Sequence, residues 1–102
     1  MNDRTQPGAF AVADGGARWT YAGSLTFANA ESVLEAARAL ALPSDGVADL
    51  SGVGHADSAA LAVLLALRRR AAAEGATLAF ESVPDSIVLL ARVYGVDTLV
   101  GV

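Results

Sequence analysis

The alternation of apolar and polar residues near the start of the chain predicts two short strands. Residues 9–13 and 17–22 have the pattern of extended segments, and the Asp-Gly-Gly sequence at residues 14–16 suits the turn between them. Trp19 and Tyr21 are two residues apart, so they share one face of the second strand. We expect both rings to pack in the core, and the chain to open with an antiparallel hairpin.

Three later segments have the spacing of apolar residues that is typical of amphipathic helices. The first covers residues 30–42, with Asn29 in position to cap it. The second follows residue 57 and ends at the Glu-Gly pair of residues 74–75. The third covers residues 85–94 and begins directly after a proline, which suits the start of a helix. The buried side chains of this last helix are expected to be Ile87, Leu90 and either Val93 or Tyr94.

Further strands are expected between the helices, at residues 47–53 and 77–83, while residues 97–102 either add a short strand or pack as a tail. Residues 1–8 are expected to form a loose tail and residues 9–102 a single domain. A hairpin followed by alternating helices and strands predicts an α/β fold. Its sheet is expected to be mixed and four- or five-stranded, with the helices mainly on one face.

The most informative stretch of the chain is residues 49–70, which predict a buried strand, a short polar loop and a helix. Asp57 is placed to cap this helix by accepting a hydrogen bond from the amide of Ala59 or Ala60. Ser58 then falls in the first turn, where unpaired amides and the helix dipole favour a negative charge, such as a phosphate or a partner's acidic group. The alternative is that Asp57 and Ser58 simply start a helix.

The helix after Ser58 carries no polar side chain over residues 59–67. At 100° per residue, one face suits a core and consists of Ala60, Leu64, Leu67 and Ala71, flanked by Leu61. The opposite face carries Ala59, Ala62, Ala66 and Ala73, followed by Arg69 and Arg70. Small residues let another backbone approach closely, so this alanine face is a candidate docking surface. A general alanine bias of the chain is the alternative explanation.

Composition limits the class of partner. The chain has 102 residues, enough for one domain, and 7 basic against 11 acidic residues give a net charge of −4. This balance argues against binding to nucleic acid or to an anionic membrane. The run of three arginines at residues 68–70 is expected to be the solvated half of a helix. A mean hydropathy of +0.46 is high for a small soluble monomer and favours a buried interface.

The chain lacks the residues that several classes of chemistry require. The chain has no cysteine and one histidine, His55, so neither a disulfide framework nor a zinc site is expected, and no cofactor is predicted. It has no lysine, which excludes a phosphate-binding nucleotide loop. His55, Asp57 and Ser58 lie within four positions and cannot easily reach the geometry of a catalytic triad. We therefore expect no enzymatic activity; a small phosphotransfer enzyme is a minor alternative.

The N-terminal residues are polar and do not resemble a signal peptide, and the longest apolar run is about half of what a bilayer span needs. A cytoplasmic protein with no membrane span is the expectation from these features.

Residues 47–67 resemble the core motif of STAS domains, the sulfate-transporter and anti-sigma-factor-antagonist modules. In the sporulation-type antagonists this motif is Asp-Ser-Ser-Gly-Leu, and a partner kinase phosphorylates its first serine. Asp57 and Ser58 match the first two positions and Leu61 the last. Residues 59–60, both alanine, depart from the Ser-Gly pair, which bears on kinase recognition more than on docking.

The wider resemblance, over roughly residues 10–100, is closer to the MlaB branch of this family. That branch has Asp-Thr-Gly-Gly-Leu-Ala before an apolar helix and a C-terminal segment similar to residues 83–96; the match of residues 22–27 is weaker. The resemblance implies a non-enzymatic subunit that binds the cytoplasmic ATPase of an ABC-type phospholipid transporter maintaining outer-membrane lipid asymmetry. Such a subunit would lie in the cytoplasm, peripheral to the inner membrane through the transporter complex.

The residues expected to bind this ATPase are Asp57, Ser58, Ala59, Ala62 and Ala66. The alternative within the family is an anti-sigma factor antagonist, whose partner is an anti-sigma factor kinase and whose switch is phosphorylation of Ser58.

Overall fold

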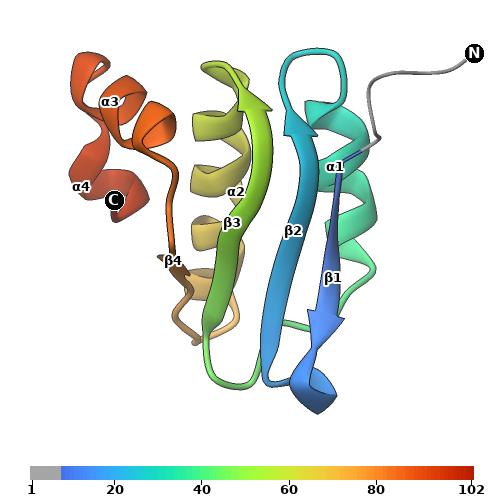
Figure 1. Ribbon diagram of the computed structural model, residues 1–102. Helices are drawn as coiled ribbons and strands as arrows, with labels where there is room; N and C mark the ends of the chain where they lie inside the picture. The colour runs from blue at the N-terminus through green and yellow to red at the C-terminus, as the bar shows by residue number, and fades with distance from the viewer. Residues whose placement is uncertain (1–7) are drawn as a thin grey trace, which may run out of the picture.

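The computed structural model describes residues 8–102, which contain one four-stranded sheet in the order β1-β2-β3-β4 (Figure 1). The strands are β1 (Ala9–Ala13), β2 (Arg18–Leu25), β3 (Val47–Ala56) and β4 (Ala79–Glu81). β1 and β2 are antiparallel, whereas β3 runs parallel to both β2 and β4. The sheet is mixed because a hairpin joins the first pair and helices cross over between the later strands.

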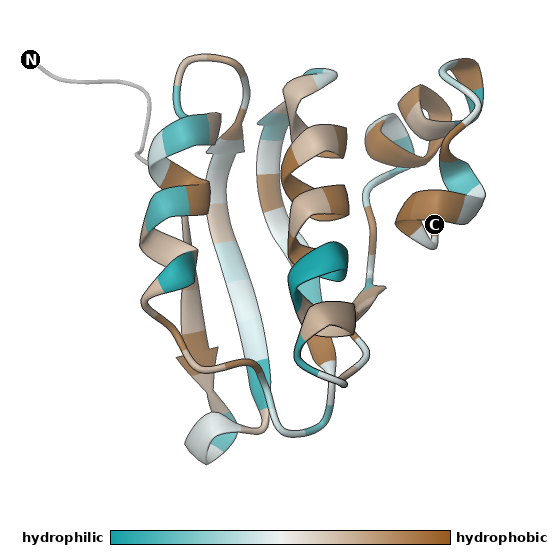
Figure 2. Cartoon of the chain, turned by 180° about the vertical axis from the view of Figure 1, so that it is seen from behind, coloured by the Kyte–Doolittle hydropathy of each residue, from teal (hydrophilic) through white to brown (hydrophobic). Residues whose placement is uncertain are grey.

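The helices are α1 (Ala30–Arg38), α2 (Ala59–Ala73), α3 (Asp85–Val93) and α4 (Asp97–Val100). α1 and α2 cover one face of the sheet, and α3 and α4 lie beyond β4, where they contact α2 (Figures 1 and 2). The predicted α/β class, the mixed sheet and the placement of helices mainly on one face are confirmed. The tail predicted for residues 1–8 lies outside the described residues, apart from Gly8.

The hairpin forms as predicted. A short 3-10 turn, η1 (Asp14–Gly16), joins β1 to β2, and its three residues have positive φ angles of 53°, 65° and 99°. Trp19 and Tyr21 are buried on the helix-covered face, as expected. The ring centroids of Phe10 and Tyr21 are 4.7 Å apart, and those of Phe10 and Trp19 are 5.3 Å apart. This aromatic cluster forms the β1–β2 side of the core.

β2 and β3 both extend three residues further than the pattern indicated, to Leu25 and Ala56. Between them the register shifts after Thr20, and Gly52 lies at this irregularity. A Cβ atom at residue 52 would collide with the backbone carbonyl of Tyr21. The lack of a side chain therefore lets the two strands approach closely where the pairing is irregular.

The first helix is shorter than predicted, because α1 ends at Arg38 rather than at residue 42. The carbonyls near this end are occupied by groups from elsewhere in the fold. The Arg70 guanidinium donates to the carbonyls of Ala37 and Leu40 at 2.9 and 2.7 Å, and the Trp19 indole donates to that of Ala41 at 3.0 Å.

The expected cap of α1 is also different. The Asn29 amide oxygen accepts from the Thr26 amide at 2.9 Å, and its amide nitrogen donates to the Ser24 carbonyl at 2.8 Å. Asn29 therefore fixes the preceding loop and does not cap the helix with its side chain.

The C-terminal part differs most from the prediction. Residues 97–102 were expected to be a strand or a tail, but Asp97–Val100 form α4, with Val100 fully buried. The strand predicted at residues 77–83 is limited to β4, and Ser82, just beyond it, has a left-handed φ of 54°.

The buried residues predicted for the last helix are only partly correct. Ile87 is fully buried and Leu90 partly buried, whereas Val93 and Tyr94 are 71% and 59% exposed. Ala91, which is fully buried, takes the core position expected for Val93 or Tyr94.

No helix within residues 8–102 is both long enough and apolar enough to cross a membrane.

Because of Tyr21, the stability of the fold is expected to depend on pH in the alkaline range. Its hydroxyl donates to the Ser24 carbonyl at 2.7 Å, and burial raises its pKa from 10.0 to about 12. A raised pKa means that the folded state holds the proton more tightly than the unfolded state. The associated stability is complete below the unfolded pKa and is lost as the pH rises through the folded one, from about 10 to about 12.

We therefore expect the free energy of unfolding, measured by urea denaturation, to fall across this pH range. Tyr21→Phe should cost about 1 kcal/mol at neutral pH, because one hydrogen bond is lost. The same variant should show a shallower decline above about pH 10, because it has no phenol to ionise. Parallel declines in the two proteins would contradict this role of Tyr21.

Candidate partner-binding surface

The loop between β3 and α2 is fixed by the carboxylate of Asp57. Its Oδ1 accepts from the Ala59 amide at 2.9 Å, and its Oδ2 accepts from the Phe27 amide at 3.1 Å. The predicted bond to Ala59 is thus confirmed. The bond to Phe27 was not foreseen, and it ties the β2–α1 loop to the start of α2. Since both carboxylate oxygens hold backbone amides, Asp57 positions this end of the molecule.

Ser58 has φ and ψ angles of −63° and −19°, which are helical values, so it occupies the first turn after the Asp57 cap. The Ser58 carbonyl accepts from the Leu61 amide at 3.1 Å. The residue is partly exposed, and within residues 8–102 none of the hydrogen bonds of this loop uses its hydroxyl. As far as these residues are concerned, the hydroxyl can reach a partner at the positive end of a 15-residue helix.

An apolar groove of about 300 Å³ begins at Ser58, and we call it the Ser58 groove. α2 forms one wall, and the segment from the end of α3 to α4 forms the other. Its lining residues are Ser58, Leu61, Ala62, Leu65, Tyr94, Val96 and Val100. Because this lining is almost entirely apolar, the groove suits an apolar surface of another protein better than a charged metabolite.

The three alanines predicted to bind a partner have different environments. Ala62 is exposed and lines the Ser58 groove. Ala66 is partly exposed and lines a different groove, on the α1 side of α2. Ala59 is only 6% exposed, so its predicted place on the outer face is wrong. α1 covers one side of α2 and the α3–α4 segment covers another. The exposed face of α2 is therefore narrower than a helix wheel indicates.

Large apolar residues near Ser58 are exposed, which the sequence pattern did not predict. Phe27 is 76% exposed on the loop held by Asp57, and Tyr94 is 59% exposed on the groove wall. Val93 is also largely exposed, next to Tyr94 in the chain. In the hydropathy view, hydrophobic colour covers much of α3, α4 and the first half of α2 (Figure 2). The unbroken apolar run Ile-Val-Leu-Leu-Ala at residues 87–91 was an available signal, because a helix buries only one face of such a run, and α3 buries Ile87 and Ala91.

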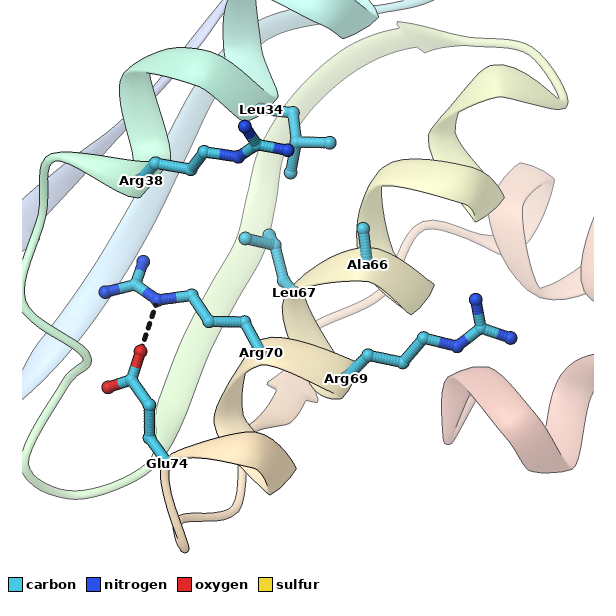
Figure 3. A pocket seen from close by; sticks show the side chains of 7 residues that line it. All are labelled: Leu34, Arg38, Ala66, Leu67, Arg69, Arg70 and Glu74. Atoms are coloured by element: carbon cyan, nitrogen blue, oxygen red, sulfur yellow. Dashed lines mark hydrogen bonds and ion pairs between the residues drawn. The ribbon is translucent and has the colours of Figure 1, made fainter.

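A second groove, of about 470 Å³, lies between α1 and α2 (Figure 3). Its lining residues are Leu34, Arg38, Ala66, Leu67, Arg69, Arg70 and Glu74. Arg70 pairs with Glu74 at 2.9 Å while it binds the carbonyls at the end of α1. Arg70 therefore links α2 to the end of α1 beside this groove.

Contrary to expectation, the arginine run at residues 68–70 is not simply solvated. Arg70 holds α1, and Arg68 donates to the Leu99 carbonyl of α4 at 3.3 Å. Arg69 alone of the three is exposed. Two of the three cations thus bind helix ends, where the dipole favours a positive charge.

Comparison with known proteins agrees with this architecture. A family model described as "Mlab, STAS domain" matches residues 13–101, which is most of the chain. The chain therefore belongs to the STAS-domain family, and within it to the MlaB type. No curated protein matches the chain as a relative.

The double role of Asp57 predicts a measurable loss of stability. Asp57→Ala removes a helix cap and the tie to the Phe27 loop, so the free energy of unfolding should fall by about 1–2 kcal/mol. Asp45→Ala, in an exposed turn, is the matched control and should change it by less than about 0.5 kcal/mol. Equal effects in urea denaturation would contradict the positioning role.

Proposed function

We propose that this chain is a non-catalytic subunit that binds the cytoplasmic ATPase of an ABC-type phospholipid transporter, a system that maintains outer-membrane lipid asymmetry. The observation that carries the proposal is the Ser58 groove, an apolar surface whose lining includes Ser58 and Leu61, two of the residues that resemble the core motif of STAS domains. The subunit would then be cytoplasmic and held at the inner membrane through the transporter complex. Membership of the MlaB type supports this assignment.

A binding role fits the chemistry of the surface. Asp57, the acidic residue of the motif, is engaged with two backbone amides and is poorly placed to act as a general base. Residues 8–102 contain no cluster of histidine, cysteine and acidic residues that could hold a metal ion. The chain also has no lysine to bind a nucleotide's phosphates.

The shape of the surface indicates how the ATPase would be recognised. Ala62 lines the groove together with Leu65 and Tyr94, and its small side chain would let a partner side chain enter there and lose contact with water. Phe27, on the far side of the Asp57 loop, offers a second apolar contact. The Ser58 hydroxyl, in the lining of the groove, would supply a polar contact that fixes the orientation of the partner.

Ala62→Glu should abolish co-purification with the transporter ATPase of the same organism, because a carboxylate buried in an apolar contact without a cation costs several kcal/mol. Ala73→Glu, on the exposed last turn of α2 and outside the groove, is the control and should bind normally. Ala66→Glu reports whether the interface extends to the second groove. If Ala62→Glu folds by circular dichroism and still binds, the Ser58 groove is not the interface.

Substitutions at Ser58 test whether this residue contributes to the binding of the ATPase. Ser58→Ala should weaken ATPase binding by no more than about tenfold, because one hydroxyl hydrogen bond is worth roughly 0.5–1.5 kcal/mol. Ser58→Glu should prevent binding without loss of stability, since an acidic group in the first turn suits the helix dipole. Unchanged affinity of Ser58→Glu would remove this residue from the interface.

The available hydroxyl of Ser58 also favours a second candidate, an anti-sigma factor antagonist regulated by phosphorylation. In that case the partner is an anti-sigma factor kinase. The intact mass of the protein from its native cells would then include a phosphorylated form, which Ser58→Ala lacks. An unmodified mass under all growth conditions, together with ATPase binding, would exclude this candidate.

The purified protein should release no phosphate from ATP and magnesium above the buffer rate, because the chain offers neither a phosphate-binding lysine nor an activated nucleophile. The measurement is a phosphate-release assay on wild type and Ser58→Ala. Turnover that persists through further purification and is lost in Ser58→Ala would contradict a non-catalytic role.

A further inference from the structure

β1 forms one edge of the sheet, and within residues 8–102 only β2 pairs with it. Natural edge strands are normally protected against further pairing by lysine, proline, a bulge or very short length. β1 has the sequence Ala-Phe-Ala-Val-Ala, without charge or proline, and pairs with β2 over five positions without a register shift. The opposite edge, β4, is only three residues long and lies beside α3 and α4 (Figure 1).

We propose that the free edge of β1 pairs antiparallel with β1 of a second copy of this chain, giving a symmetric dimer with one continuous sheet. The strand is self-complementary about Ala11. A two-fold axis midway between the two copies of Ala11 places Ala9 opposite Ala13 of the second copy and Phe10 opposite its Val12.

The two faces of the sheet support this register. A two-fold axis perpendicular to the sheet keeps both helical layers on the same side, so paired residues must belong to the same face. This requires one residue of the strand to lie directly opposite its own copy, and not opposite the copy of its neighbour. Centring on Ala11 pairs all five residues of β1, whereas centring on Phe10 or Val12 leaves part of the strand unpaired.

Side chains and charges agree with the same register. Phe10 and Val12 face the helix side, together with Tyr21 and Trp19 that pair with them. Val12 is nevertheless 50% exposed, because no described element covers it at the sheet edge. In the dimer, Phe10 of the second copy lies beside Val12, an aromatic and β-branched pair that is favourable across strands.

β1 carries no charged side chain, and Asp14, the nearest acidic residue in the chain, lies beyond the strand in η1, so the pairing of residues 9–13 brings no like charges together.

This surface is separate from the one proposed to bind the ATPase. β1 lies at the opposite end of the sheet from α3 and α4 (Figure 1), so a dimer leaves both Ser58 grooves open. A contact built on five residues from each copy is smaller than a standard interface of about 1,200–2,000 Å². We therefore expect a reversible dimer with a dissociation constant in the micromolar range.

Cysteine cross-linking tests the register, because the natural chain contains no cysteine. The two copies of residue 11 should have Cα atoms about 4.5–5.5 Å apart, within the range of a disulfide. The two copies of residue 9 are at least about 13 Å apart in this register, because each faces residue 13 of the other copy and the two are offset by four residues along the strands. Ala9 and Ala11 are both exposed, so Ala9→Cys is a matched control.

Under mild oxidation, Ala11→Cys should form a disulfide-linked dimer at least tenfold faster than Ala9→Cys. A mixture of Ala9→Cys with Ala13→Cys should form the mixed dimer in preference to either homodimer. Equal rates for Ala11→Cys and Ala9→Cys would overturn the proposal.

Sedimentation of the cysteine-free protein gives an independent measurement. Wild type should shift from monomer to dimer as its concentration rises through the micromolar range. Val12→Lys should stay monomeric, because a lysine at the strand edge opposes pairing, whereas Leu89→Lys, an equally non-conservative change at a 62% exposed site, should dimerise normally. A wild type that remains monomeric at several hundred micromolar, or a dimer that Val12→Lys leaves intact, would refute the inference.

Discussion

The burial of α2 against the sheet is the interaction on which the other parts of the molecule depend. Seven of its fifteen residues are buried, more than the single stripe of an ordinary surface helix, because the sheet, α1 and the α3–α4 segment all pack around it. Two of its side chains, Leu64 and Leu67, are almost fully inaccessible to solvent. The start of this helix is in turn fixed by Asp57, so the loop that carries Ser58 is held in place by the core.

Polar contacts from α2 complete this arrangement by satisfying the ends of its neighbours. A helix that stops inside a folded domain leaves carbonyl groups that need hydrogen-bond donors. The Arg70 guanidinium supplies them for the end of α1, and Arg68 reaches the Leu99 carbonyl of α4. Arg70 and Arg68 therefore connect α1 and α4 to the second half of α2, which has a structural role. Its first half remains apolar and borders the Ser58 groove.

The fold therefore separates two surfaces with different physical character. The Ser58 groove depends on side chains from α2, α3 and α4, and it suits an apolar partner surface that enters between helices. The edge of β1 offers backbone donors and acceptors, and its uncharged side chains suit a second strand of the same sequence. Their positions at opposite ends of the sheet allow one chain to use both at once.

The sequence by itself determined the features that depend on neighbouring residues. The hairpin, the cap of Asp57 on α2, the core face of α2 and the mixed sheet could all be predicted, because turns and periodic faces are set within a few residues. Tertiary structure decided the end of α1, whose last carbonyls bind Arg70, 33 and 30 residues away. It also decided that residues 97–100 are helical, where α4 packs on α2, and that Tyr94 faces the groove. Such contacts between distant segments leave no periodic signal in the chain, because the partner that satisfies each group lies on another element.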